Sequence, residues 1–214
     1  MKNKKVSKAV IRRLPRYYRE LGLLKQKKIE RISSGDLAER LGLNPSQVRQ
    51  DLNCFGGFGQ QGYGYQVSSL HKELASILGL TRTYRAIIAG AGNIGQALCK
   101  YEGFLELGFE TLALFDIDKS LVGKLVCEKP VMHIDKMGDF ILSNNVDIGI
   151  IAARRRAAQP IADIMVKSGI RAIWNFVPAD ITVPVPLENV HLSDSLLVLT
   201  YQLASANEQE QDKA

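Results

Sequence analysis

Three glycines near the middle of the chain have the spacing of a dinucleotide-binding turn. They lie in the run Gly90-Ala91-Gly92-Asn93-Ile94-Gly95, which follows a short apolar segment, residues 86–89, and begins a helix-like segment that runs to about Tyr101. In such a strand-turn-helix unit the first glycine makes a tight turn, the second lets a pyrophosphate approach the backbone, and the third lets the helix pack closely on the strand. The helix N–H groups then face the phosphates. The pattern predicts a cofactor site at Gly90, Ala91, Gly92, Asn93, Ile94 and Gly95.

Asp116 is the second candidate for cofactor binding. It follows another apolar segment, residues 111–115, and lies 21 residues after Gly95. A carboxylate at this point hydrogen-bonds the hydroxyl groups of the adenosine ribose and repels a 2′-phosphate, so the predicted cofactor is NADH or NAD⁺ rather than its phosphorylated form. Because the glycine turn and Asp116 hold the ADP part that NADH and NAD⁺ share, they cannot distinguish the two.

Residues for hydride-transfer chemistry are not evident. The chain has no Tyr-x-x-x-Lys motif, and His71, His133 and His191 stand without a partner pattern. The roughly 125 residues after Gly90 suffice for one Rossmann unit and a final helix. The three cysteines form no C-x-x-C pair, so no metal site is expected. We therefore expect a binding protein and not an enzyme, with a small NAD-dependent oxidoreductase that carries a nucleic-acid domain as the alternative.

A second group of side chains, in the first third of the chain, is of the types that read DNA. Asn44 and Pro45 are typical of the first positions of a helix, which we expect to run to about Phe55. Apolar residues at i, i+4 and i+7 should face a core and leave polar residues outward, where arginine pairs with guanine and glutamine or asparagine with adenine. Asp51, a poor neighbour for phosphate, should orient a nearby arginine. The predicted DNA contacts on this helix are Ser46, Gln47, Arg49, Gln50 and Asn53.

Two further segments complete the predicted DNA-binding module. A helix from Ser33, a capping residue, to Gly42 precedes the reading helix and makes a helix-turn-helix. Residues 55–65 alternate glycines with aromatic residues, which predicts a β-hairpin wing that reaches the minor groove with Gln60, Gln61 and Tyr63. The amphipathic first helix, with a kink or restart at Pro15, should add Arg12, Arg13 and Arg16.

Charge divides the chain in the same way. Residues 1–85 hold 17 Lys and Arg against 6 Asp and Glu, whereas residues 86–214 hold 11 against 16. A basic module of this kind is expected where one half meets a polyanion.

No apolar run approaches the roughly 18 residues of a membrane span, and the Lys-rich start lacks the apolar core of a signal peptide. We expect a cytoplasmic protein.

The second half alternates strands and helices. Apolar segments at residues 146–152 and 172–176 flank an amphipathic helix at 158–168, and a final helix at 193–206 is more apolar than a lone surface helix requires. The predicted fold is α/β: an N-terminal winged helix (1–80), a Rossmann-type, mostly parallel sheet (81–190), and a C-terminal dimerisation helix (191–206). Residues 207–214 should form a disordered tail.

These motifs together resemble the Rex family of redox-sensing transcriptional repressors, over about residues 6–203. The resemblance implies a homodimer with exchanged C-terminal helices that binds operator DNA when NADH is scarce and is released when NADH binds. It also implies fermentative or respiratory target genes. A repressor gated by another nucleotide, such as an acyl-CoA, remains an alternative. The segments that carry the resemblance are VSKAVIRRLPRYYR, SQVRQDLNCFGGFGQQGYGY, GAGNIGQAL, FDID and IWNFVP.

The chain departs from this family in two places. Many members carry Lys at position 50 and Lys-Arg at positions 60 and 61, where this chain has glutamines, so we expect an altered base preference and fewer phosphate contacts. Many members also carry Val-Pro after the fourth strand of the second domain. Here residues 153–156 read Ala-Arg-Arg-Arg, and these arginines either attract phosphate or are merely solvated.

Overall fold

The computed structural model describes residues 6–60 and 63–211 and divides the chain into two compact units, 1–82 and 83–214. The first unit is a winged helix, as predicted. Its strands form a three-stranded antiparallel sheet in the order β1-β3-β2. Its elements are α1 (Lys8–Gln26), β1 (Arg31–Ile32), α2 (Ser34–Leu41), α3 (Pro45–Asn53), β2 (Gly59–Gln60), β3 (Gly64–Gln66) and α4 (Val67–Ile77).

Local caps fix the helix-turn-helix as the sequence predicts. Ser33 accepts a hydrogen bond from the Asp36 N–H, Gly42 ends α2 in the left-handed conformation, and Asn44 caps α3. The helix does not restart at Pro15, because α1 continues through it as one helix. One face of α1 from Leu14 to Leu24 packs in the core of this unit, on both sides of the proline, and this packing outweighs the missing N–H.

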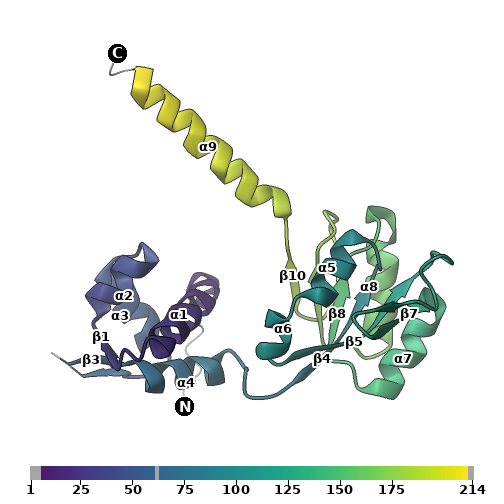
Figure 1. Cartoon of the computed structure of the whole chain (residues 1–214), viewed down its shortest axis with the longest axis horizontal. Helices are drawn as coiled ribbons and strands as arrows, with labels where there is room; N and C mark the ends of the chain where they lie inside the picture. The colour runs from purple at the N-terminus through teal and green to yellow at the C-terminus, as the bar shows by residue number, and fades with distance from the viewer. Residues whose placement is uncertain (1–5, 61–62, 212–214) are drawn as a thin grey trace. The chain divides into compact units, whose positions relative to one another are not determined.

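The second unit is built on a seven-stranded sheet in the order β10-β9-β8-β4-β5-β7-β6, parallel except for the β6–β7 pair (Figure 1). This is the strand order of a Rossmann fold with one added edge strand. Its strands are β4 (Tyr84–Ala89), β5 (Phe109–Asp116), β6 (Leu125–Val126), β7 (Lys129–His133), β8 (Ile148–Ile151), β9 (Ala172–Asn175) and β10 (Leu187–Asn189). Its helices are α5 (Asn93–Lys100), α6 (Gly103–Glu106), α7 (Met137–Asn144), α8 (Ala158–Lys167) and α9 (Leu192–Gln211), with short 3₁₀ turns η1 (Ile134–Lys136) and η2 (Arg155–Ala157).

Alternating strand residues serve two cores. Ile87 and Phe115 face α7 and α8 on one side of the sheet, while Ile88 and Leu114 face α5 on the other. The first residues after β4, β5 and β8 meet at the carboxyl edge, next to the point where the strand order reverses. Ligands bind at this point in open α/β sheets.

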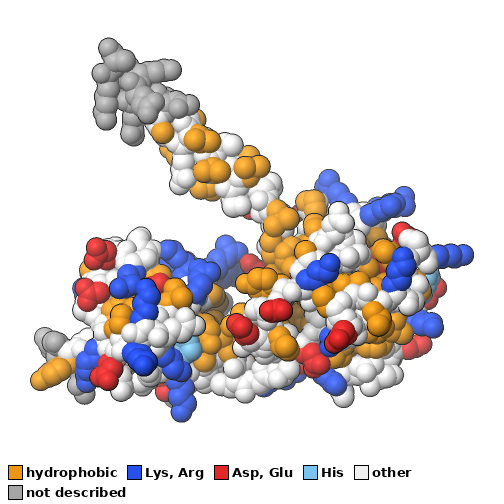
Figure 2. Space-filling view, viewed as in Figure 1, with side chains coloured by type: hydrophobic (Ala, Val, Ile, Leu, Met, Phe, Trp, Pro, Cys, Tyr) orange, Lys and Arg blue, Asp and Glu red, His pale blue; other side chains and the backbone are white. Residues whose placement is uncertain are grey.

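The C-terminal helix differs from the prediction in length. α9 runs through Gln211, so the predicted tail begins too early, and residues 212–214 lie outside the described part. Its apolar side chains are exposed in the single chain, among them Leu196, Leu199 and Tyr201 (Figure 2). None of the described helices is long and apolar enough to span a membrane.

Candidate dinucleotide pocket and nucleic-acid interface

The glycine turn after β4 has the geometry that its spacing predicts. Gly90 has a φ of +107°, and a Cβ there would lie 2.4 Å from the Ala152 carbonyl oxygen. A Cβ on Gly95 would lie 1.9 Å from the Gly90 carbonyl oxygen, whereas one on Gly92 would meet nothing within 4 Å. Gly90 and Gly95 are therefore required by the fold, while Gly92 borders open space at the start of α5, where its small size keeps the backbone accessible.

Asp116 ties the turn to the end of β5. Its Oδ2 accepts a hydrogen bond from the Ala91 N–H at 2.7 Å, and its Oδ1 accepts from the N–H groups of Ile117 and Asp118. The carboxylate is thereby held in one orientation at the pocket edge. Each carboxylate oxygen has two lone pairs, so Oδ2 keeps capacity for a ligand hydroxyl group.

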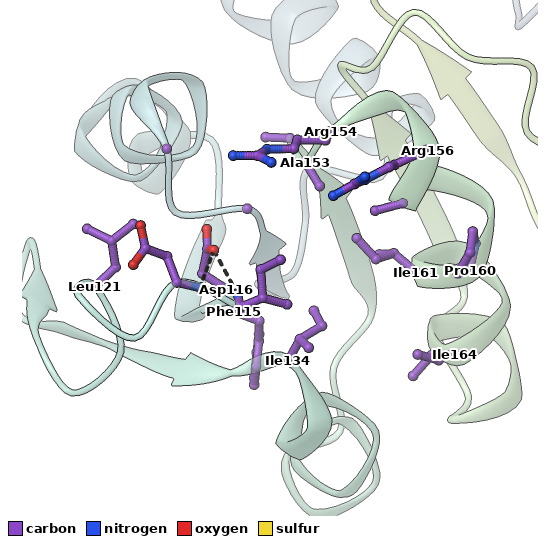
Figure 3. A pocket seen from close by; sticks show the side chains of 16 residues that line it. Phe115, Asp116, Leu121, Ile134, Ala153, Arg154, Arg156, Pro160, Ile161 and Ile164 are labelled. Carbon is purple, nitrogen blue, oxygen red and sulfur yellow. Dashed lines mark hydrogen bonds between the residues drawn. The ribbon is translucent and has the colours of Figure 1, made fainter.

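A cavity of about 550 Å³ lies against this turn (Figure 3). Of the residues predicted for the cofactor, Gly90, Gly92 and Asp116 line it, whereas Asn93 and Ile94 are exposed at the start of α5 and Gly95 packs beneath the turn. The walls of the cavity were not predicted from the sequence, and they come from four segments of the chain. They are Phe115, Ile117, Asp118, Leu121, Ile134, Ala152, Ala153, Ala157, Pro160, Ile161 and Ile164.

The loop after β8 adds charge to the cavity. Arg154 and Arg156 line it, and Arg155 between them does not. Among the described residues, no three His, Cys, Asp or Glu side chains gather into a group that could hold a metal ion. The cavity is thus an apolar hollow with a glycine turn, two carboxylates and two guanidinium groups at its rim.

In the winged helix, α3 presents the polar face that its periodicity predicts. Ser46, Arg49, Gln50 and Asn53 are exposed, while Val48 and Leu52 are fully buried, along with Asp51. Arg49 is positioned by hydrogen bonds from its Nη1 and Nη2 to Ser34 and Ser46, both at 3.0 Å. A preordered arginine of this kind loses less side-chain entropy when it pairs with a base.

Asp51 anchors α3 to α1, as expected for a residue that orients an arginine. Its carboxylate accepts hydrogen bonds from Arg13 Nε at 2.6 Å and Nη2 at 2.8 Å, from the Tyr17 hydroxyl at 2.8 Å, and from Gln47 Nε2 at 2.7 Å. Arg13 and Gln47, both predicted to contact DNA, thus point polar groups toward Asp51.

The pKa values in this cluster follow from burial and hydrogen bonding. Burial acts to raise the pKa of Asp51, but the hydrogen bonds from Arg13, Tyr17 and Gln47 outweigh it and hold this pKa below its ordinary value. Burial, together with the bond to Asp51, raises the pKa of Tyr17. The pKa of Arg13 is raised chiefly by its hydrogen bond to Asp51. The ionised form of Asp51 is therefore the one that joins α1 to α3.

The other predicted DNA contacts lie on α1 and on the wing. Arg12 is exposed, and Arg16 donates to the Leu41 carbonyl at the end of α2. Tyr63 is exposed on the wing with its ring 5.8 Å from the Arg31 guanidinium. Gln60 ends β2, and Gln61 lies outside the described residues.

Fold and sites together define a winged-helix DNA-binding protein joined to a Rossmann-type dinucleotide-binding domain. Comparison with known families agrees with both halves. Residues 5–53 match the family model "Putative DNA-binding protein N-terminus", and residues 81–179 match the model "CoA binding domain".

Individual relatives are similar over almost the whole chain. The redox-sensing transcriptional repressor Rex of Clostridium kluyveri is 52% identical over 93% of this chain and 96% of its own length. The crystal structure of RSP in complex with β-NAD⁺ and operator DNA matches with a TM-score of 0.89 at 50% identity, covering 97% of each chain. The structure of RSP with β-NADH matches with the same TM-score at 48% identity, covering 98% of each. The chain belongs to the Rex family of redox-sensing transcriptional repressors.

Proposed function

We propose that this chain represses transcription by binding operator DNA as a dimer and releases the DNA when NADH occupies its Rossmann domain. One similar structure is a complex with β-NAD⁺ and operator DNA and another is a complex with β-NADH, and this chain carries a candidate site for each kind of ligand. The resemblance supplies the direction of the switch. The protein acts through binding, without turning the dinucleotide over.

The DNA is read by α3 in the major groove. Its exposed face offers Arg49 for guanine and Gln50 and Asn53 for adenine, with Ser46 toward the backbone. The operator is also contacted by Arg12, Arg13 and Arg16 of α1 and by Gln47 of α3, and the wing reaches the minor groove with Gln60, Gln61 and Tyr63. The 3.0 Å hydrogen bonds from Arg49 to Ser34 and Ser46 support its role, because they fix its guanidinium before binding.

The dinucleotide lies across the carboxyl edge of the sheet. Its pyrophosphate meets the start of α5 beside Gly92, and its adenosine ribose meets Asp116. Ala91 lies in the turn and Asn93 and Ile94 lie at the start of α5, next to the pyrophosphate, and Gly95 lets α5 approach β4 closely. The fixed carboxylate of Asp116 favours NADH and NAD⁺ over their 2′-phosphorylated forms, because it would repel an added phosphate at this position.

Two apolar surfaces support a two-fold dimer. α9 exposes a row of large apolar side chains, and the α5 side of the sheet has an apolar hollow of about 250 Å³ lined by residues such as Phe104, Leu107 and Trp174. Apolar surfaces of this extent are normally covered in a soluble protein, and a two-fold dimer matches two operator half-sites.

The observation that carries the proposal is that one chain has both features: open space beside Gly92, where a dinucleotide can approach the backbone, and an exposed polar face on α3, which can read DNA. It is tested by selecting bound duplexes from a random DNA library with the full chain, without dinucleotide, with NAD⁺ and with NADH. We expect enrichment of a two-fold symmetric sequence in the first two selections and none in the third. No enrichment at all, or equal enrichment with NADH, would refute the proposal. Equal loss with coenzyme A would show that another nucleotide gates the protein.

A further inference from the structure

We propose that Arg154 and Arg156 form an anion subsite that holds the pyrophosphate of the bound dinucleotide from the side opposite α5. The inference rests on the proposed function, because it takes the cavity to be the NADH and NAD⁺ site. It assigns a role to two residues of a loop that departs from the family pattern.

The position of the two arginines in the fold is the first support. They follow β8, the neighbour of β4 at the point where the strand order reverses, and they flank the start of η2. The glycine turn after β4 lies against the same loop, since a Cβ on Gly90 would meet the Ala152 carbonyl oxygen and the Ala153 nitrogen. A pyrophosphate at Gly92 would therefore lie between the start of α5 and this loop.

The second support for the subsite is the direction in which the Arg154 and Arg156 side chains point. Figure 3 shows the guanidinium groups of Arg154 and Arg156 directed into the cavity, with that of Arg154 extending toward the glycine turn. Arg155 does not line the cavity. In sequence the three arginines are equivalent, so the fold itself separates two residues that line the cavity from one that does not.

Their lack of partners is the third support. Among the described residues, neither guanidinium forms an ion pair within 4 Å or a side-chain hydrogen bond, and Arg154 interacts with the Asp118 carboxylate only at longer range. The two acidic residues of the cavity, Asp116 and Asp118, lie at the end of β5, and both are engaged with backbone N–H groups. The positive charge at the β8 side is thus available to phosphate oxygens, which guanidinium groups bind in a bidentate manner.

This subsite would serve NADH and NAD⁺ equally, because the pyrophosphate belongs to the part that they share. It would raise the affinity for both forms without changing the ratio between them. When either form keeps the cavity filled, the fraction occupied by NADH depends on the ratio of the two and not on the concentration of NADH alone. The arginines would therefore help the protein respond to a ratio.

The test measures the affinities of the full chain for adenosine, AMP, ADP, NADH and NAD⁺ by calorimetry. We expect Arg154→Ala and Arg156→Ala each to weaken ADP, NADH and NAD⁺ by about 5- to 20-fold, the effect of one charged hydrogen-bonding group that is partly exposed, and adenosine by less than about 2-fold. Arg155→Ala removes the same charge from the same loop and serves as the matched control, with less than about a 2-fold effect on all five ligands.

Three outcomes would overturn the inference: an equal loss in Arg155→Ala, an equal loss of adenosine binding, or unchanged ADP binding in both cavity variants. The unsubstituted chain gives a second measurement, since its affinity for ADP should fall with added salt more steeply than its affinity for adenosine. If the unsubstituted chain binds neither NADH nor NAD⁺, the proposed function fails. If it binds both and the cavity variants do the same, only the arginine subsite fails.

Discussion

Replacing Asp51 by asparagine should separate α3 from α1 and weaken the DNA-binding unit. The substitution keeps the size of the side chain but removes its charge and places an NH₂ group where Arg13, Tyr17 and Gln47 all donate hydrogen bonds. At least one donor of the cluster is then left without an acceptor in a site where Asp51 is 1% exposed.

The magnitude follows from the burial of the two charged partners. Removing one partner of a fully buried ion pair costs about 3–5 kcal/mol. The Arg13 side chain is 23% exposed and can turn partly to water, so we expect the lower end, about 3 kcal/mol. At about 4 °C for each kcal/mol, the smallest conversion for a unit of this size, the melting temperature falls by about 12 °C.

The assay is hydrogen exchange of the amides in α1 and α3 within the full chain, which measures the opening free energy of this unit alone. Trp174, the single tryptophan of the chain, lies on β9 and reports by fluorescence that the second unit is unchanged. Glu20→Gln is the matched control, because it removes a carboxylate from a partly exposed ion pair with Arg40, whose own side chain is 42% exposed, and should cost at most about 1 kcal/mol.

The pH dependence of stability follows from the same carboxylate. Because the pKa of folded Asp51 is lowered, its stabilisation is fully present above its ordinary pKa of 3.8 and is lost as the pH falls through the folded value. The unsubstituted chain should therefore lose stability below about pH 4, and Asp51→Asn should lose less over that range. A variant that matches Glu20→Gln in stability and acid sensitivity would refute the reasoning.

Three other perturbations separate the roles of single elements. Gly92→Ala should keep the melting temperature and lower dinucleotide affinity at least about 10-fold. Gly95→Ala should instead destabilise the second unit by about 2 kcal/mol or more, because its Cβ meets the Gly90 carbonyl. Calorimetry and thermal melting distinguish the two variants, and equal behaviour of both would contradict the assignment. Gln50→Lys should make the logarithm of operator affinity fall more steeply with the logarithm of salt concentration, by about 0.9, for one added phosphate contact; an unchanged slope would place residue 50 away from phosphate. Removing residues 192–214 should give a monomer in sedimentation with weaker operator binding, and a persistent dimer would assign the interface elsewhere.

Local chemistry explains what the sequence predicted well. The reading face of α3 and the glycine turn depend on residues close together in the sequence, where capping residues and periodicity indicate the local structure. Asp51 was expected to orient an arginine, but its partner Arg13 lies 38 residues away and only the fold brings the two together. The apolar walls at Phe115, Ile134 and Ile161 come from separate strands and helices, which no local pattern relates.

Very short elements were harder to predict. The strand β1 has two residues, too few for an alternating pattern, and is held in place by its pairing with β3. The β6–β7 hairpin turns at Cys127 and Glu128, both with positive φ, where the usual glycine or asparagine signal is missing. The sequence predicted a tail from residue 207, but α9 begins in an apolar segment and extends through its polar end to Gln211.

The central claim is that NADH in the second unit weakens DNA binding by the first. It is tested most directly by the fluorescence anisotropy of a labelled duplex, selected as above, bound to the full chain and titrated with NADH or NAD⁺. We predict that NADH weakens the affinity for DNA by about 5- to 150-fold, the usual range of coupling between two sites, while NAD⁺ leaves the complex intact. Equal release by both dinucleotides, or release by neither, would contradict the claim.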